Sequence, residues 1–208
     1  MDKFDKEILV IERELLFCDG SFEGFKPHSE DSNYETLILN NFKFLRRGDV
    51  EEDPSHKQPI GYALLVNPET NKVFAYQRST KAGEKRLHGK WSWGIGGHVE
   101  RSDQHIGNPV YLSLLRELEE EVEMDGKILD VNVLGYINDD SNQVGEVHFG
   151  ILYLIKTDST TIEPRDSEIE VGAMLGIEEL EKKIADENVV VEDWSRISFD
   201  PLKEYLQA

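Results

Sequence analysis

Apolar and polar residues along this chain follow two periods, and each period predicts a different kind of element. Short apolar runs bounded by turn residues predict strands over residues 60–66, 72–77, 131–137, 147–155 and 169–175. A turn joins the first two strands, so we expect a hairpin there. Apolar residues at helical spacing predict helices over residues 109–122, 177–184 and 195–205. Strands and helices mixed in this way indicate an α/β (α+β) fold.

The first 57 residues have a less regular pattern. Residues 8–17 are rich in apolar side chains and fit either a strand or a short helix. Residues 34–45 place leucines and phenylalanines at mixed helical spacings behind two candidate N-caps, Asp31 and Ser32, which predicts one helix. A charged, proline-bearing segment then breaks the pattern. We expect an N-terminal extension, residues 1–57, that packs as a strand plus a helix on a main domain, residues 58–208.

The helix over residues 109–122 has the clearest signals. Asn108 and Pro109 suit its N-cap and its first position, because an asparagine side chain accepts amide hydrogen bonds and proline needs no amide there. One face of the helix is apolar and is expected to pack against the rest of the domain. This face consists of Tyr111, Leu114, Leu115, Leu118 and Val122.

Another side of the same helix concentrates negative charge, with five carboxylates in positions 117–123. At about 100° per residue, Glu117, Glu120 and Glu121 fall within one arc of roughly 100°, away from the apolar face. Like charges this close repel unless a cation lies among them, and gathered hard oxygens suit Mg²⁺ or Mn²⁺. The commoner interpretation of a glutamate-rich helix is a solvated acidic face.

A glycine pair ahead of the helix favours the metal site. Twenty residues separate Gly96 from Arg116, and the loop of Gly96 and Gly97 lets the backbone approach a ligand or metal closely, because glycine carries no side chain. Arg116 precedes Glu120 by four residues and can hold that carboxylate in place.

Composition limits what such a metal would serve. With 208 residues, 38% of them hydrophobic, the chain can bury a full core and fits one domain with an added segment. The formal net charge of −19 argues against general binding to nucleic acids or anionic membranes. Cys18 is the only cysteine, which excludes an internal disulfide and a multi-cysteine zinc site. The chain lacks a signal-peptide core and any apolar run of roughly 20 residues, so a soluble cytoplasmic protein is expected.

Two stretches together resemble the Nudix box, G-x5-E-x7-R-E-U-x-E-E-x-G-U, where U is an aliphatic residue. They are residues 93–100, Trp-Gly-Ile-Gly-Gly-His-Val-Glu, and residues 116–122, Arg-Glu-Leu-Glu-Glu-Glu-Val. The first glycine of the box falls on Gly97, and its core falls on Arg116, Glu117, Leu118, Glu120 and Glu121. The resemblance implies a Nudix-type α/β/α sandwich with a mixed β-sheet. It also implies a magnesium-dependent, MutT-like pyrophosphohydrolase acting on a diphosphate.

The match has three departures. The early glutamate of the box falls on Asp103, a shorter acid, which leaves its role open. About five extra residues, around 104–108, lengthen the loop before the helix. Glu123 stands where the box has glycine, which predicts a helix longer by a turn. Residues 53–58, 83–91 and 193–196 also resemble a bacterial Nudix subgroup of predicted phosphoesterases, and this likeness names no substrate.

The resemblance implies specific roles. The Gly97 carbonyl with Glu117, Glu120 and Glu121 would ligate Mg²⁺, and Arg116 would orient the carboxylates without touching the substrate. The general base stays open among Glu120, Glu100, Asp103, Glu146, Glu168 and Glu170. For each of the last five alone, ordinary surface charge is the commoner interpretation.

The expected substrate is a phosphorylated small molecule, for which three candidate binding residues precede the box: Lys85, Arg86 and Trp91. The two basic residues belong to a patch with Lys81, His88 and Lys90 that can attract a phosphate or form a solvated loop. Trp91 can stack on a base, as can Tyr62, Tyr76 and Trp93, although aromatic residues near strands more often lie in the core. His98 and His148 lack ligand-like spacing and are interpreted as structural or incidental.

Two other functions fit the same fold. An isoprenoid diphosphate isomerase is disfavoured, because that chemistry uses a cysteine in the site and Cys18 lies far from the box. A non-catalytic sensor module is disfavoured, because it has no need for all three carboxylates. The N-terminal extension is expected either to cover a sheet edge or to form a homodimer contact.

Overall fold

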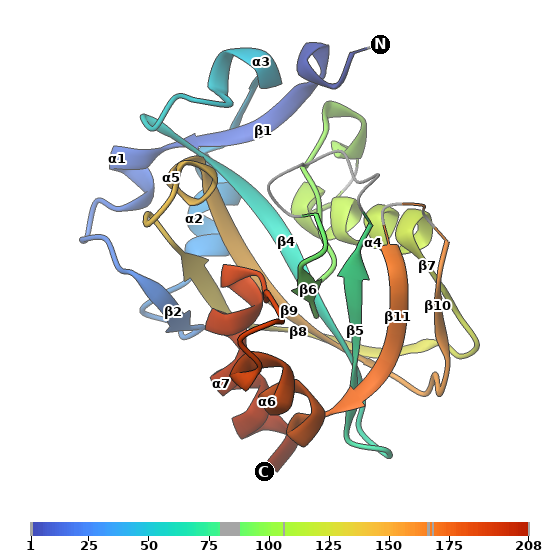
Figure 1. Ribbon diagram of the computed structural model, residues 1–208. Coiled ribbons are helices and arrows are strands. Elements are labelled where there is room, and N and C mark those ends of the chain that lie inside the picture. Colours follow the sequence, from blue (N-terminus) through green and yellow to red (C-terminus); the bar gives the residue numbers. More distant parts are fainter. Residues whose placement is uncertain (1, 80–87, 106, 166, 168, 208) are drawn as a thin grey trace. The chain divides into compact units, whose positions relative to one another are not determined.

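The computed structural model describes residues 2–79, 88–105, 107–165, 167 and 169–207 (Figure 1). The chain forms two compact units. Unit 1 comprises Met1–Tyr62, Gly96–Arg116 and Val133–Leu152, and unit 2 comprises Ala63–Ile95, Glu117–Asn132 and Tyr153–Ala208. Across the described ranges, no helix is both long and apolar enough to span a membrane.

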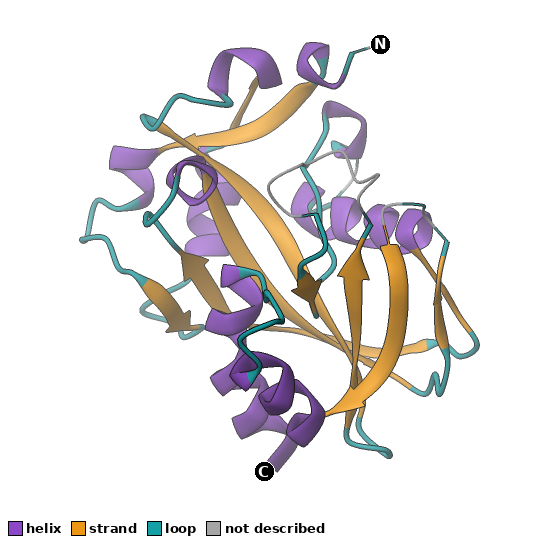
Figure 2. Ribbon diagram, in the orientation of Figure 1, coloured by secondary structure: helices purple, strands orange, loops and turns teal. Residues whose placement is uncertain are grey.

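Four elements contain a boundary between the two units, so each has residues in both. They are strands β4 (His56–Asn67), β8 (Ile128–Asn138) and β9 (His148–Thr157) and helix α4 (Pro109–Glu121). Unit 1 contains β2 and the parts of β4, β8 and β9 that fall within its residues. Unit 2 contains β5, β11 and the remaining parts of those three strands. Figure 2 distinguishes the strands from the helices.

The first 50 residues of unit 1 contain more elements than one strand and one helix. Residues 8–17, which fit either a strand or a helix, divide into β1 and α1. The elements in order are a 3-10 turn (Lys3–Asp5), β1 (Glu7–Glu12), α1 (Arg13–Leu16), β2 (Gly24–Pro27), α2 (Tyr34–Asn41), β3 (Lys43–Arg46) and α3 (Arg47–Val50). Strand β1 pairs antiparallel with β3 and then with β4.

The predicted helix over residues 34–45 is wrong in its last turn. Helix α2 ends at Asn41, and residues 43–46 form a strand in which Leu45 lies opposite Ile8 of β1. Leu45 there packs against a buried cluster of Ile8, Val10 and Val50, so burial and pairing outweigh local helical spacing. The cap was also misplaced, because the Asn33 side chain accepts the Thr36 amide at 3.0 Å.

Five aromatic rings join the first 40 residues of unit 1 to its residues 133–152. Their centroids lie 5.0–6.5 Å apart in mostly tilted or edge-to-face pairs, an arrangement that adds favourable contacts to the burial. The rings belong to Phe17, Phe22, Tyr34, Tyr136 and Phe149. Strand β2 pairs antiparallel with the end of β8 beside them, and α5 (Gln143–Val147) precedes β9.

Unit 2 confirms the predicted hairpin. Strand β5 (Lys72–Arg78) pairs antiparallel with the end of β4, and β11 (Ile169–Gly176) pairs along the length of β5. The short β6 (Trp91–Ser92) also pairs with β5. The predicted C-terminal helices are confirmed as α6 (Ile177–Ala185) and α7 (Asp193–Gln207).

The predicted lengthening of the acidic helix beyond Glu121 is wrong. Helix α4 ends at Glu121, and the next residues form β7 (Val122–Met124), which pairs antiparallel with β10 (Ile162–Pro164). Glu123 lies opposite Glu163 in this ribbon. The backbone hydrogen bonds of the ribbon therefore replace a further helical turn. The start of α4 is as predicted, since Asn108 Oδ1 accepts the amides of Val110 at 2.9 Å and Tyr111 at 3.2 Å.

Candidate functional site

The diglycine loop of unit 1 runs directly against β4. A Cβ atom on Gly96 would lie 2.2 Å from the carbonyl oxygen of Gly61, so only glycine fits this approach. The next residues form an antiparallel bridge in which His98 lies opposite Ile60. The sequence indicated that the glycines allow a close approach of the backbone. The structure shows that Gly96 makes such an approach to strand β4.

Arg116 ties this loop to α4. Its guanidinium donates from Nε to Asp103 Oδ1 at 2.9 Å and from Nη2 to Asp103 Oδ2 at 3.0 Å, a bidentate pair. Nη2 also donates to the His98 carbonyl at 3.1 Å. Asp103 is 5% exposed, and its Oδ2 accepts the Glu100 amide at 2.8 Å. Asp103 therefore serves as a structural acceptor, which disfavours it as general base.

The three acids of the candidate metal site lie at the end of α4, in unit 2. Glu120 is exposed and Glu117 and Glu121 are partly buried, with the Oε2 atom of Glu121 fully shielded from solvent. Within the described residues, no three or more His, Cys, Asp or Glu side chains are already gathered to hold a metal ion. Three carboxylates on one arc of a helix nevertheless provide the oxygen donors that Mg²⁺ prefers. The three glutamates therefore suit Mg²⁺ by the type of their donor atoms and by their shared side of the helix.

An arginine that the sequence did not single out lies near this helix. Arg78, at the end of β5, donates from Nε to Glu192 Oε1 at 2.6 Å, and their side chains are 13% and 8% exposed. Burial alone would lower the pKa of Arg78, but the nearby Tyr76, Glu192 and Glu121 outweigh it and hold this pKa above its usual value. Glu121 thus has a permanent positive charge in its surroundings.

Of the three candidate substrate-binding residues, the structure describes Trp91. Trp91 lies in β6, partly buried, and Lys183 of α6 places its Nζ atom 3.2 Å from the centroid of the indole ring. One ring face is therefore covered. Lys85 and Arg86, with Lys81, fall outside the described residues.

The other aromatic candidates belong to the core. Tyr62, Tyr76 and Trp93 are each at most 4% exposed. Trp93 donates from Nε1 to Ser198 Oγ at 3.2 Å, and its amide donates to Ser195 Oγ at 3.1 Å. The segment 193–196, noted in the sequence only for its resemblance, thus begins the helix that fixes the strand leading to the glycine loop.

The remaining base candidates are not equivalent. Glu100 is paired with Lys6, whose Nζ lies 2.6 Å from Oε1. Glu146 and Glu170 are exposed, and Glu168 falls outside the described residues. Glu120 is exposed on α4 and stays a candidate for the base.

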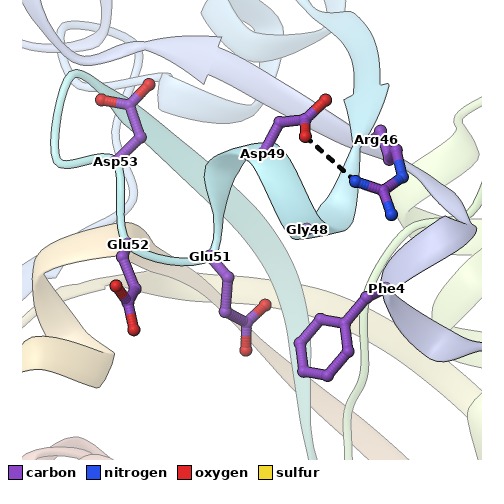
Figure 3. A pocket seen from close by; sticks show the side chains of 7 residues that line it. All are labelled: Phe4, Arg46, Gly48, Asp49, Glu51, Glu52 and Asp53. Atoms are coloured by element: carbon purple, nitrogen blue, oxygen red, sulfur yellow. Dashed lines mark hydrogen bonds and ion pairs between the residues drawn. The ribbon is translucent and has the colours of Figure 1, made fainter.

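A surface hollow of unit 1 does not suit an anionic substrate. It encloses about 530 Å³ (Figure 3). Its lining residues are Phe4, Arg46, Gly48, Asp49, Glu51, Glu52 and Asp53. Its arginine is already bound by Asp49 and Asp5. Four carboxylates around one neutralised arginine would repel a phosphate.

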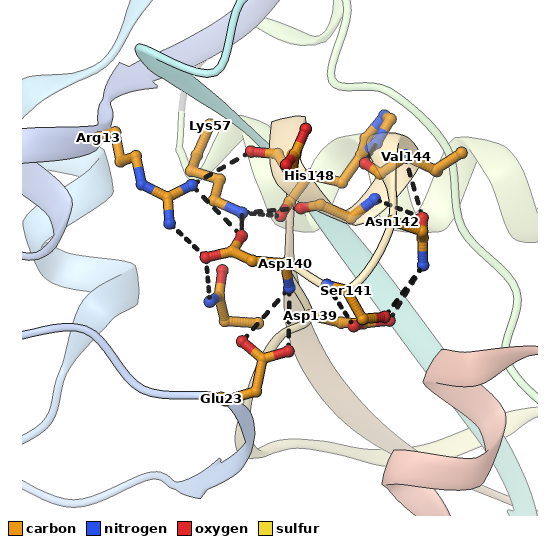
Figure 4. Close-up of polar contacts among 12 residues, drawn as sticks. Arg13, Glu23, Lys57, Asp139, Asp140, Ser141, Asn142, Val144 and His148 are labelled. Carbon is orange, nitrogen blue, oxygen red and sulfur yellow. Dashed lines mark hydrogen bonds and ion pairs between the residues drawn. The ribbon is translucent and has the colours of Figure 1, made fainter.

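A buried lysine organises the turn that precedes β9 in unit 1 (Figure 4). Lys57 is 0% exposed, and its Nζ donates to Asp140 Oδ1 at 2.7 Å, to the Gly145 carbonyl at 2.7 Å and to the His148 carbonyl at 3.1 Å. Burial would raise the pKa of Asp140, but hydrogen bonds from Arg13 and Lys57 hold it at about 2. The cluster is therefore an ion pair at neutral pH.

Two histidines interpreted from the sequence as structural or incidental form a buried pair in unit 1. His148 Nδ1 lies 2.6 Å from the Val144 carbonyl, so this nitrogen carries the proton, and Nε2 faces His98 Nε2 at 3.1 Å. His98 Nε2 also lies 2.7 Å from Gln58 Oε1. Burial lowers the pKa of His148 from 6.5 to about 4 and the pKa of His98 well below 6.5.

This pair predicts a pH dependence of stability. The unfolded chain binds a proton at His148 near pH 6.5, whereas the folded chain resists it down to about pH 4. Stability is therefore complete above pH 6.5 and is lost as the pH falls toward 4, by on the order of 3 kcal/mol from His148. Urea unfolding between pH 7.5 and pH 4.5 measures this slope. The variant His148→Gln should show a shallower slope, and an equal slope would contradict the assignment.

Comparisons with known proteins agree with these features. A sequence model described as the NUDIX domain matches residues 57–194. Protein YmaB of Bacillus subtilis (strain 168) is 35% identical over 98% of this chain and 100% of its own length. The crystal structure of Tm1382, provisionally named a Nudix hydrolase, superposes with a TM-score of 0.78 at 28% identity, covering 96% of this chain and 100% of that one.

A more distant structure shares the fold. It is a bifunctional NMN adenylyltransferase/ADP ribose pyrophosphatase from Francisella tularensis, complexed with AMP and a Mn ion. Its TM-score is 0.51 at 17% identity, covering 72% of this chain and 42% of that one. The fold class predicted from the sequence, a Nudix α/β/α sandwich with a large mixed sheet, is confirmed. The chain belongs to the Nudix family and is an enzyme of the Nudix hydrolase type.

Proposed function

We propose that the protein hydrolyses a diphosphate linkage in a nucleoside diphosphate derivative or a related compound, and that it does so with Mg²⁺ or Mn²⁺. One observation carries the proposal: α4 presents Glu117, Glu120 and Glu121 on one arc, in the order and spacing of the Nudix box. The apolar residues of α4, which provide its packing, lie on a different side of the helix.

The roles follow from the chemistry of the groups. Glu117, Glu120 and Glu121 would hold the cation, and the family pattern adds the Gly97 carbonyl. When bound, the cation neutralises charge on the diphosphate and lowers the pKa of a coordinated water. Arg116 holds Asp103 and the loop backbone, so it positions the site without contacting the substrate.

Substrate binding is proposed for Lys85, Arg86 and Trp91. In a protein with a net charge of −19, a dianionic substrate needs a local source of positive charge. Lys183, which already lies over Trp91, adds to that source. The Francisella structure with AMP and a Mn ion supports a nucleotide-type ligand and a divalent metal for this fold.

A substrate panel tests the proposal. Purified protein with Mg²⁺ is incubated with nucleotide sugars, dinucleoside polyphosphates, ADP-ribose and nucleoside triphosphates, and phosphate-containing products are separated by anion exchange. We expect metal-dependent cleavage of at least one class, abolished by EDTA and restored by Mg²⁺ or Mn²⁺. Tight binding of one compound without cleavage would instead favour a sensor module.

A further inference from the structure

Strand β1 of the N-terminal extension contacts the Nudix box loop directly, within unit 1. The Leu9 amide donates to the Val99 carbonyl at 2.8 Å. Next to this bond, Ile8 and Glu100 form an antiparallel bridge. The residues that follow Gly97 are therefore a short backbone partner of β1, a role that no motif in the sequence indicates.

Two ion pairs reinforce the backbone contact, and both use adjacent residues on each side. Lys6 Nζ lies 2.6 Å from Glu100 Oε1. Arg101 donates to both oxygens of Glu7, from Nε at 2.7 Å and from Nη2 at 3.1 Å. The guanidinium of Arg101 also lies over the Phe44 ring of β3, 4.5 Å from its centroid. The extension thus holds side chains and backbone of the same loop residues.

The loop is held on its other sides by the remainder of unit 1. Arg116 donates to the His98 carbonyl, and Gly96 lies against the Gly61 carbonyl. Gly97 lies between these points and has no side chain that could fix its own carbonyl. Its orientation is therefore set by its neighbours, and β1 supplies the contacts on the C-terminal side.

We propose that β1 is a positioning element of the active site: by holding Val99 to Arg101 it fixes the direction of the Gly97 carbonyl. This inference rests on the proposed function, in which that carbonyl takes part in holding the cation. The ion pair of Lys6 with Glu100, called the joint below, connects the two segments. Glu100 then acts as a positioning residue, and its carboxylate is engaged in the joint instead of serving as the base.

The test uses the full-length protein and Mn²⁺ binding followed by electron paramagnetic resonance, without substrate. Lys6→Glu places two like charges at the joint and should raise the Mn²⁺ dissociation constant on the order of tenfold, as loss of a supporting contact around a metal site does. Exchange of the Leu9 amide proton, which reports the bond to Val99, should accelerate in the same variant. Lys6→Arg keeps the charge pair and should restore both values.

Lys43→Glu is the matched control, because it makes the same change of charge and Lys43 forms a similarly exposed pair with Glu12 within the extension. Both its Mn²⁺ affinity and its Leu9 exchange should stay at the wild-type values. Glu100→Gln should weaken Mn²⁺ binding as Lys6→Glu does. Loss of kcat in Glu100→Gln with unchanged Mn²⁺ affinity would instead identify Glu100 as the base and overturn the positioning role.

The outcomes separate the two proposals. A wild-type protein that binds Mn²⁺, together with a Lys6→Glu variant that binds it equally tightly, overturns the role of β1 and leaves the proposed function standing. A wild-type protein that binds no Mn²⁺ overturns the metal function itself. An equal loss of affinity in Lys43→Glu would show a general effect of charge and would also overturn the role of the Lys6–Glu100 pair.

Discussion

Replacing Glu120 with glutamine is expected to lower turnover at least about a hundredfold, the effect seen when a central electrostatic group is removed from an active site. Glutamine keeps the size of the side chain and removes its charge, so the variant loses a hard anionic ligand. Glu120 is exposed on α4, and the fold should therefore remain intact. The measurement is kcat on the substrate that the panel identifies, with thermal unfolding followed by circular dichroism.

Glu119→Gln provides a control one residue away. Glu119 is exposed on the same helix but about 100° outside the arc of the three acids. The contact that it makes with Arg165 uses its backbone carbonyl, which the substitution leaves in place. Its turnover should stay within about twofold of wild type, as for a surface change away from a site. Near-wild-type turnover in Glu120→Gln, or an equal loss in Glu119→Gln, would contradict the site.

Local signals explain which elements could be predicted. Helix α4 combines a side-chain cap at Asn108, a proline at its first position and one apolar face, and all three act within a few residues. Strand β3 depends instead on pairing with β1, where Leu45 meets Ile8. Nothing near Leu45 in the chain reports that partner, and the spacing of its neighbours favours a helix. The end of α4 depends in the same way on β10.

The same distinction applies to the candidate site. The three acids of α4 could be found from the sequence because they lie on one helical arc, where spacing alone places them together. The acceptor for Arg116 is Asp103, thirteen positions away, and the partner of Glu100 is Lys6, ninety-four positions away. Such pairs are set by the fold. The residues that position the site are therefore less predictable from sequence than those that would bind the metal.

Lys57 marks the place where a single substitution should cost the most stability. It was noted in the sequence only within a stretch of family likeness, yet it is fully buried and satisfies one carboxylate and two backbone carbonyls. Removing its ammonium group leaves the buried carbonyls of Gly145 and His148 without that donor, while Asp140 keeps its pair with Arg13. The turn at residues 139–147 and the start of β9 depend on this lysine.

Lys57→Met is expected to lower the free energy of unfolding by about 4 kcal/mol, the range found for breaking a buried ion pair. Methionine fills most of the space, so the loss arises from the unmet carbonyls of Gly145 and His148 and from a weaker environment for Asp140. Urea unfolding at pH 7 measures it. Lys43→Met, which removes an exposed pair, should stay close to wild type, because solvent screens such pairs. If Lys57→Met unfolded at the same urea concentration as Lys43→Met, water would have to reach those carbonyls, and the cluster would not be the stabilising centre of unit 1.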